Sequence, residues 1–239
     1  MSGYTSAQIF AVELVGTFVL VVLATGTMVY DAQSGGAYGL YIAAAGPFVA
    51  LVICVGLFAR VSLAHFNPAV TIAYCVTGHT KRGQLAWYLS AEIAGAVLGS
   101  LFVMAFIGTD ADLGANAPNR DLPVIVTFPA EVLASAMLMG VILYVVYTKG
   151  LRGFGGAAIG GIVALDILLM GNVSGASMNP ARALAPAVLS GAVADLWLYW
   201  TAPFAGTVAA AVLARRRFRA QAVRGGGGGG DDGGSGDAP

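Results

Sequence analysis

The chain has 239 residues, and its 12 basic and 12 acidic side chains give a formal net charge of zero. Hydrophobic residues make up 58% of it and the mean hydropathy is +0.80, whereas about a quarter of the residues in an ordinary soluble domain are charged. A nucleic-acid partner is excluded because no basic surface could displace the counterions of a nucleic acid. Disorder is excluded because disordered chains are poor in hydrophobic residues. We expect lipid to be the main surroundings of this protein.

Six apolar stretches are long enough to cross a bilayer, which requires about 20 residues in a helix. The N-terminus lacks the cationic region and small-residue cleavage pattern of a signal peptide, so we expect the first stretch to remain in the membrane. In chain order the stretches are 7–29, 40–62, 84–107, 124–147, 155–172 and 196–214.

Two further apolar segments, 66–77 and 178–190, are too short to span the membrane. Each begins a helix at a proline, Pro68 or Pro180, and proline suits the first helical turn because its missing N–H would be unpaired there. Ten or eleven residues give a helix of roughly 15 Å, half of the hydrocarbon thickness. The expected fold class is therefore an all-α membrane protein with six transmembrane helices and two half-helices.

The chain also repeats itself. Asn67-Pro68-Ala69-Val70 is echoed by Asn179-Pro180-Ala181-Arg182, 112 residues later. Each half, 1–119 and 120–215, holds three spans and one half-span, and because three is odd, the second half must insert upside down. Such inverted repeats with interrupted segments point to a pathway at the repeat interface. Residues 216–239 are predicted to form a cytoplasmic basic stretch and a flexible glycine-rich tail.

Basic residues mark the cytoplasmic ends of transmembrane helices. Nine of the twelve fall in segments that these spans place on one side, while the opposite loops carry mainly aspartates. We therefore expect a multi-pass protein of the plasma membrane with both termini in the cytoplasm. The nine residues are Lys81, Arg82, Lys149, Arg152, Arg215, Arg216, Arg217, Arg219 and Arg224.

Two half-helices that enter from opposite faces would meet with their N-termini at the centre of the membrane. Non-helical backbone at that depth is tolerated only where protein buries it or where it lines a water-filled cavity. Each helix N-terminus carries about half a unit of positive charge, so the meeting point repels cations. Asn67 and Asn179 precede the half-helices, where the oxygen of each amide can cap the helix while its NH₂ group donates to water. The two Asn-Pro-Ala triplets are thus the predicted central constriction.

The segments His65–Thr71 (HFNPAVT) and Ser177–Arg182 (SMNPAR) resemble the paired signature loops of the aquaporin, or major intrinsic protein, family. Glu13–Phe18 resembles the start of the family's first helix, and the resemblance covers about residues 5–215. It implies six helices plus two half-helices, a homotetramer with one pore per subunit, and passive transport of water or small neutral solutes. It implies neither a cofactor, a metal nor an enzymatic activity.

The resemblance also implies a selectivity filter in the outer half of the pore. Arg182 stands at the position of the family's filter arginine, and the carbonyl of Ala176 is expected to line the filter. Ile167 occupies a position where strict water channels carry histidine, and an isoleucine there is similar to filters of the archaeal branch. The aromatic position falls on Pro47, next to Phe48, and we assign Phe48 to the filter on the expectation that Pro47 shifts the helix register.

Four buried ionisable residues remain. Glu13 and Glu131 occupy matched positions, and the resemblance implies that they brace the two loops; a proton relay is the alternative. His65 is interpreted as a pore-facing or loop-bracing residue. Asp166, beside Ile167, does not fit the family pattern. It is either a neutral or hydrogen-bonded carboxyl at a helix or subunit interface or a group that tunes permeation.

Positions that distinguish water channels from glycerol channels in the family favour water here. Ala183 stands where glycerol facilitators carry aspartate, and Ala187 and the pair Tyr199-Trp200 are also of the water-channel type. We therefore expect a water channel that excludes protons and ions. An aquaglyceroporin-like pore for glycerol, gases or other neutral solutes is the alternative within the class, and an ion-coupled secondary transporter is the alternative outside it.

Overall fold

The computed structural model describes residues 4–226, which form helices and no strand. Six helices in this range are long and apolar enough to cross a membrane, as predicted. Their boundaries agree with the predicted stretches to within a few residues, except for the last stretch, predicted over 196–214, where α10 begins at Ala202 and ends at Gly226. They are α1 (Ser6–Gln33), α2 (Leu40–Ser62), α4 (Leu85–Phe106), α6 (Val124–Tyr147), α7 (Gly155–Ser174) and α10 (Ala202–Gly226).

The two predicted half-helices are also present. They are α3 (Pro68–Thr77) and α8 (Pro180–Ser190), and each has its proline at the first helical position. The remaining elements are a left-handed turn labelled α5 (Asp110–Gly114), a short helix α9 (Leu196–Tyr199) and two 3₁₀ segments, η1 (Arg82–Gln84) and η2 (Lys149–Phe154).

Helix α10 continues well past the predicted end of the sixth span at residue 214. The tail that we predicted over 216–239 therefore begins as helix, and residues 227–239 lie outside the described residues. Near the start of this extension, Arg215 Nη1 donates to the carbonyl oxygen of Val76 at 3.0 Å. The cation thereby satisfies a terminal carbonyl of α3, the end of a helix dipole that favours positive charge.

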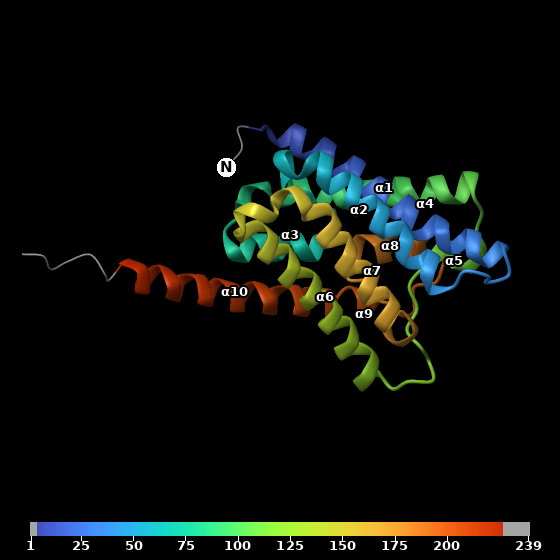
Figure 1. Ribbon diagram of the computed structural model, residues 1–239. Coiled ribbons are helices and arrows are strands. Elements are labelled where there is room, and N and C mark those ends of the chain that lie inside the picture. The colour runs from blue at the N-terminus through green and yellow to red at the C-terminus, as the bar shows by residue number, and fades with distance from the viewer. Residues whose placement is uncertain (1–3, 227–239) are drawn as a thin grey trace, which may run out of the picture.

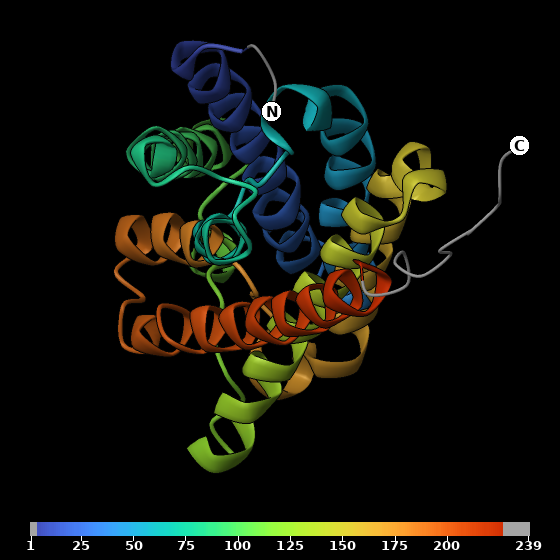
Figure 2. The same ribbon diagram turned by 90° about the vertical axis from the view of Figure 1, so that its left-hand side faces the viewer.

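The helices of the two halves pack in matching ways. Helix α1 packs on α4, and α6 packs on α10 in the same manner; α2 packs on α7 across the halves. Each half-helix lies against the third long helix of the other half, α3 on α10 and α8 on α4. In Figures 1 and 2 the helices surround the half-helices, and α1 begins at the end of the bundle where α10 finishes.

Glycines set the closest approaches between the paired helices. A Cβ atom on Gly95 of α4 would lie 2.4 Å from the Leu14 carbonyl oxygen, and one on Gly206 of α10 would lie 2.2 Å from the Val132 carbonyl oxygen. Both obstacles are backbone atoms, which cannot rotate away. The matched pairs α1–α4 and α6–α10 therefore each depend on a glycine, as is common in membrane helix packing.

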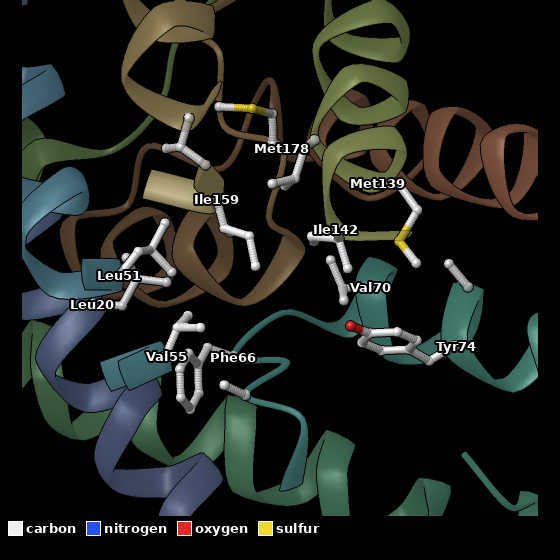
Figure 3. Packing of buried hydrophobic residues seen from close by; sticks show 14 of the residues in the cluster. Leu20, Leu51, Val55, Phe66, Val70, Tyr74, Met139, Ile142, Ile159 and Met178 are labelled. Atoms are coloured by element: carbon white, nitrogen blue, oxygen red, sulfur yellow. The ribbon is translucent and has the colours of Figure 1, made fainter. Parts of the chain in front are cut away.

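The main apolar cluster gathers side chains from both halves around the centre of the bundle (Figure 3). Phe66 and Met178, from the two loops that precede the half-helices, project into it from opposite directions. Because each loop is anchored in this shared cluster, the half-helices are fixed relative to the long helices. Labelled members include Leu20, Leu51, Val55, Val70, Tyr74, Met139, Ile142 and Ile159.

We predict that Gly206→Ala lowers the stability of the protein by about 1–3 kcal/mol, because the new methyl group overpacks the α6–α10 contact. Gly140→Ala is the matched control, since a Cβ at Gly140 of α6 meets nothing within 4 Å. Thermal unfolding of the purified protein in detergent measures both. Equal melting temperatures for the two variants would show that α6 and α10 can move apart to accommodate the methyl group without a loss of stability.

Candidate functional site

The two half-helices meet at their N-termini, and each Asn binds the loop of the other half. Asn67 Oδ1 accepts the Ala69 N–H at 2.9 Å, and Asn179 Oδ1 accepts the Ala181 N–H at 3.0 Å, so both cap their helices as predicted. The amide nitrogens cross over: Asn67 Nδ2 donates to the Met178 carbonyl, and Asn179 Nδ2 to the Phe66 carbonyl, both at 2.8 Å. An amide NH₂ group carries two donors, so each Asn keeps one donor for another acceptor.

The loop before α3 has no helical hydrogen bonds, and Glu13 supplies acceptors for it. Glu13 is fully buried; its Oε1 accepts from Ser62 Oγ at 2.5 Å and from the His65 N–H at 3.0 Å, and its Oε2 accepts from the Phe66 N–H at 2.7 Å. Ala64 and Phe66 have positive φ angles of 53° and 50°, a region that costs free energy for residues with a side chain. One carboxylate thus holds a strained loop in place.

Glu131 does the same for the loop before α8. Its Oε1 accepts from the Met178 N–H at 2.5 Å and its Oε2 from Ser174 Oγ at 2.8 Å, and Ala176 and Met178 have positive φ angles. The two glutamates therefore lie where the resemblance placed them, as braces whose oxygens face loop donors.

A serine and a tyrosine complete each brace; of these four residues only Tyr199 was named from the sequence, and for a different role. Ser62 and Ser174 end the helices before the loops, and their hydroxyls accept the Ala64 and Ala176 N–H groups. Two tyrosines, Tyr88 in the first half and Tyr199 in the second, donate to the carbonyls of these serines, each at 2.7 Å. Ser62 and Ser174 are 112 residues apart, the same spacing as the two Asn-Pro-Ala triplets, so a search for matched serines would have found them, whereas Tyr88 and Tyr199 are out of register by one residue.

His65 lines the cavity and also braces the loop. Its ring is 4% exposed, stacks on Tyr88 with centroids 4.1 Å apart, and places Nδ1 2.7 Å from Thr71 Oγ1. Thr71 Oγ1 in turn donates to Glu92 Oε1 at 2.5 Å. Because the single hydroxyl proton of Thr71 is used in that bond, His65 Nδ1 must be the donor to Thr71. The loop-bracing interpretation of His65 agrees with this geometry.

A cavity of about 320 Å³ passes the junction of the half-helices. Ile159, Val163, Ile167 and Gly171, at every fourth position of α7, line one wall, so the cavity extends over about 18 Å along that helix. Its lining is mostly apolar, with polar groups from Asn67, Asn179 and a few others. Within residues 4–226, Arg182 is the one lining residue of the Asp, Glu, Lys or Arg types.

Arg182 is held from two sides. Its Nη1 donates to the Gly114 carbonyl at 2.9 Å and to Asn116 Oδ1 at 2.5 Å, and its Nη2 donates to Met28 Sδ at 3.0 Å. Asn116 Nδ2 donates to the Gly175 carbonyl at 2.9 Å, which orients the amide so that its oxygen faces the guanidinium. The guanidinium has five N–H donors, so two remain for the cavity.

The structure corrects the assignment of Phe48. Helix α2 continues through Pro47 without a shift of register, so Pro47 lines the cavity and Phe48, about 100° further round the helix, points away. Phe48 is 37% exposed and packs where α2 approaches Gly160 of α7. Ile167 and Ala176 line the cavity together with Arg182, and their role as a filter stays a prediction.

The four positions that separate water channels from glycerol channels lie outside the cavity lining. Ala183 and Tyr199 pack in a buried cluster with Leu198. Ala187 is buried on α8, and Trp200 is 39% exposed and packs against Phe204. These four side chains therefore do not contact the cavity, and their role in selecting water over glycerol stays a prediction.

Asp166 is buried on α7, and neither of its carboxyl oxygens has a hydrogen-bond partner among the described residues. It does not line the cavity. A hydrogen bond at a helix interface within the chain is therefore not formed, and a neutral carboxyl or a bond across a subunit interface stays a prediction. A buried polar group without a partner costs stability.

We predict that Glu131→Gln lowers stability by about 1.5–3 kcal/mol for each charged hydrogen bond that it loses. The amide NH₂ group would face an N–H or O–H donor of the loop, because both carboxylate oxygens now accept. Thermal unfolding in detergent measures the loss. Asp121→Asn, at an exposed position, is the control and should leave the melting temperature unchanged; an equal shift in both variants would contradict the bracing role.

We predict that Asp166→Asn raises stability by about 1–3 kcal/mol, because a neutral amide of the same shape replaces a carboxyl that must either bury a charge without partners or bind a proton at a cost in free energy. Asp112→Asn, at an exposed site, is the control. The comparison is made by chemical or thermal unfolding at the same pH. A loss of stability in Asp166→Asn alone would mean that the carboxyl has a stabilising role.

Known proteins resemble this chain along most of its length. The sequence model of the family described as Major intrinsic protein matches residues 2–214. The probable aquaporin NIP7-1 of Arabidopsis thaliana is 34% identical over 203 residues, which cover 84% of this chain and 73% of the relative. Glycerol uptake facilitator protein-like 6 of Lactiplantibacillus plantarum is 34% identical over 215 residues, covering 86% and 96%.

A solved structure has the same fold. The aquaglyceroporin from Plasmodium falciparum superimposes with a TM-score of 0.78 at 23% identity, covering 92% of this chain and 100% of that one.

Proposed function

The chain belongs to the major intrinsic protein family of membrane channels, and from this premise we propose that it conducts water passively down osmotic gradients while excluding protons and ions. The observation that carries the proposal is the cavity at the junction of the half-helices, which is mostly apolar and holds a small set of fixed donors. Apolar walls bind water weakly, so it passes quickly, and the few donors fix its orientation.

Exclusion of cations follows from three positive features along this path. The N-termini of α3 and α8 point at the junction, each with a partial positive charge, and Arg182 adds a full charge in the same cavity. Protons need a continuous chain of water molecules that both donate and accept. A water that accepts from the free N–H groups of Asn67 and Asn179 points its own protons outward, which interrupts that chain.

A second candidate function is passage of glycerol and other small uncharged solutes. Pro47 and Ile167 line the same cavity as Arg182, and by resemblance they stand at filter positions where strict water channels of the family carry an aromatic residue and a histidine. Pro47 and Ile167 form an apolar wall that suits the hydrocarbon side of a polyol. Arg182 and Asn116 can form hydrogen bonds with its hydroxyl groups. The relative from Lactiplantibacillus plantarum is named for glycerol uptake.

An ion-coupled transporter is disfavoured by the position of the acidic groups. The carboxylate oxygens of Glu13 and Glu131 accept hydrogen bonds from loop N–H groups, and Asp166 does not line the cavity. Within the described part of the chain no carboxylate lines the path, so a coupling cation has no charged ligand there.

We further propose the plasma membrane as the location, with both termini in the cytoplasm, and a homotetramer as the assembly. The basic residues near the ends of α2, α6 and α10 support this orientation by the positive-inside rule, and α1 begins where α10 ends (Figure 1). The homotetramer and the inverted orientation of the two halves are proposed because the chain belongs to this family.

Stopped-flow light scattering on proteoliposomes tests the function. An osmotic shock reports water flux, a glycerol gradient reports solute entry, and a pH-sensitive dye reports proton leak. We expect water flux well above that of protein-free liposomes with no proton leak. Water flux at the lipid background, or saturable uptake driven by a proton or sodium gradient, would overturn the proposal.

We predict that Arg182→Val increases the ratio of glycerol to water flux by about tenfold and admits a proton leak, because it widens the constriction and removes its charge. Arg120→Val is the matched control, since Arg120 is 72% exposed and paired with Asp195 on the surface. The same three flux assays measure both variants. If Arg182→Val left all three fluxes at the wild-type level, Arg182 would not belong to the filter.

A further inference from the structure

Met28 makes a contact with Arg182 that the proposed function does not require. Met28 lies on α1, lines the cavity, and its thioether sulfur accepts a hydrogen bond from Arg182 Nη2 at 3.0 Å. The other anchors of the guanidinium, the Gly114 carbonyl and Asn116 Oδ1, are oxygen atoms. A thioether is a weak acceptor, so the side of Arg182 that faces α1 is held by a soft and chemically reactive group.

Thioethers react with peroxides. The sulfur attacks one oxygen of hydrogen peroxide, an S–O bond forms and the O–O bond breaks, and the departing hydroxide takes up the remaining proton to give water. The sulfur is oxidised by two electrons and the peroxide is reduced, and the product, methionine sulfoxide, is polar and a far better acceptor. Hydrogen peroxide is small, uncharged and rich in hydrogen bonds, so a cavity that admits water can admit it to Met28.

We propose that Met28 is an oxidation site for hydrogen peroxide entering the cavity, and that its sulfoxide form obstructs conduction at Arg182. The inference rests on the proposed water conduction. The oxidised state is closed or nearly closed, and the reduced state is the one described above.

The geometry explains why one added oxygen matters. Sulfur and Nη2 are already 3.0 Å apart, and a hydrogen bond from nitrogen to oxygen needs about 2.9 Å by itself. An oxygen bonded to the sulfur therefore has no room between the two atoms. Either the guanidinium moves away from Met28, or the new oxygen turns into the cavity that both residues line. Both changes narrow the same constriction.

The chain offers a control methionine. Met104 on α4 is 38% exposed on the outside of the bundle and does not line the cavity, so its oxidation should not affect flux. Met178 lines the cavity too, but it is 1% exposed and enclosed in the main apolar cluster (Figure 3). Met28 is only partly buried, which makes it the more accessible of the two cavity methionines.

The experiment treats proteoliposomes with hydrogen peroxide, destroys the excess with catalase, and compares water flux after and before treatment for each protein. Wild type and Met104→Leu should lose flux by about threefold or more, because the constriction limits conduction. Met28→Leu should keep a ratio near one, since leucine has no sulfur. Peptide mapping by mass spectrometry of the same samples should place an added oxygen on Met28 in the wild type.

Three results would overturn the inference: equal loss of flux in Met28→Leu and wild type, undiminished flux in wild type with Met28 oxidised, or Met28 unmodified while Met104 is oxidised. A failure of the proposed function is distinguishable, because flux would then equal the lipid background before any peroxide is added. Met28→Gln, with an amide oxygen near the place of the sulfoxide oxygen, should conduct poorly without peroxide; if it conducts like Met28→Leu, obstruction by an oxygen atom is wrong.

Discussion

The structure depends on how two stretches of non-helical backbone are satisfied inside an apolar protein. The loops before α3 and α8 lie at the centre of the bundle, where an unpaired N–H group costs several kcal/mol. Glu13 and Glu131 solve this by accepting loop N–H groups on oxygens that are themselves fully buried. The carboxylates are thereby stabilised by several donors each, and the loops keep backbone angles that residues with side chains seldom adopt.

The two glutamates also determine the direction in which the backbone carbonyl groups of the loops point. Because the N–H groups turn toward the glutamates, the Phe66 and Met178 carbonyls are free to accept from the asparagines of the opposite half. Each Asn then caps its own helix with oxygen and ties the other loop with nitrogen. The carboxylates of Glu13 and Glu131 do not line the cavity, whereas the guanidinium of Arg182 does. The cavity is therefore positively charged, although the formal net charge of the chain is zero.

Local signals in the sequence were sufficient for the helices and for the junction. A proline at the first turn, an asparagine before it and the length of each apolar run predict α3 and α8 without knowledge of the rest of the chain. The glutamates could be paired because they occur at matched positions of a repeat. Arg182, Ile167 and Ala176 were placed by the resemblance to the family, counted along the chain from the second Asn-Pro-Ala triplet, and they line the cavity.

Residues whose partners come from distant segments could not be found in this way. Met28 and Asn116 meet Arg182 only because α1 and the left-handed turn at Gly114 converge on α8. Phe48 was misplaced for a different reason: a proline in a long, well-packed helix need not shift the register, and α2 keeps its course because α7 supports it. The partnerless state of Asp166 likewise depends on what packs around it, which periodicity does not reveal.

The crossed asparagine bonds have a consequence for how the protein is made. When α1 to α4 have been synthesised, Glu13 and its loop donors are all present, yet Asn67 Nδ2 has no Met178 carbonyl to bind and α3 has no α10 to pack against. The first half therefore enters the membrane with its re-entrant segment incomplete. The contacts that complete the first half-helix therefore form only after the second half has been synthesised.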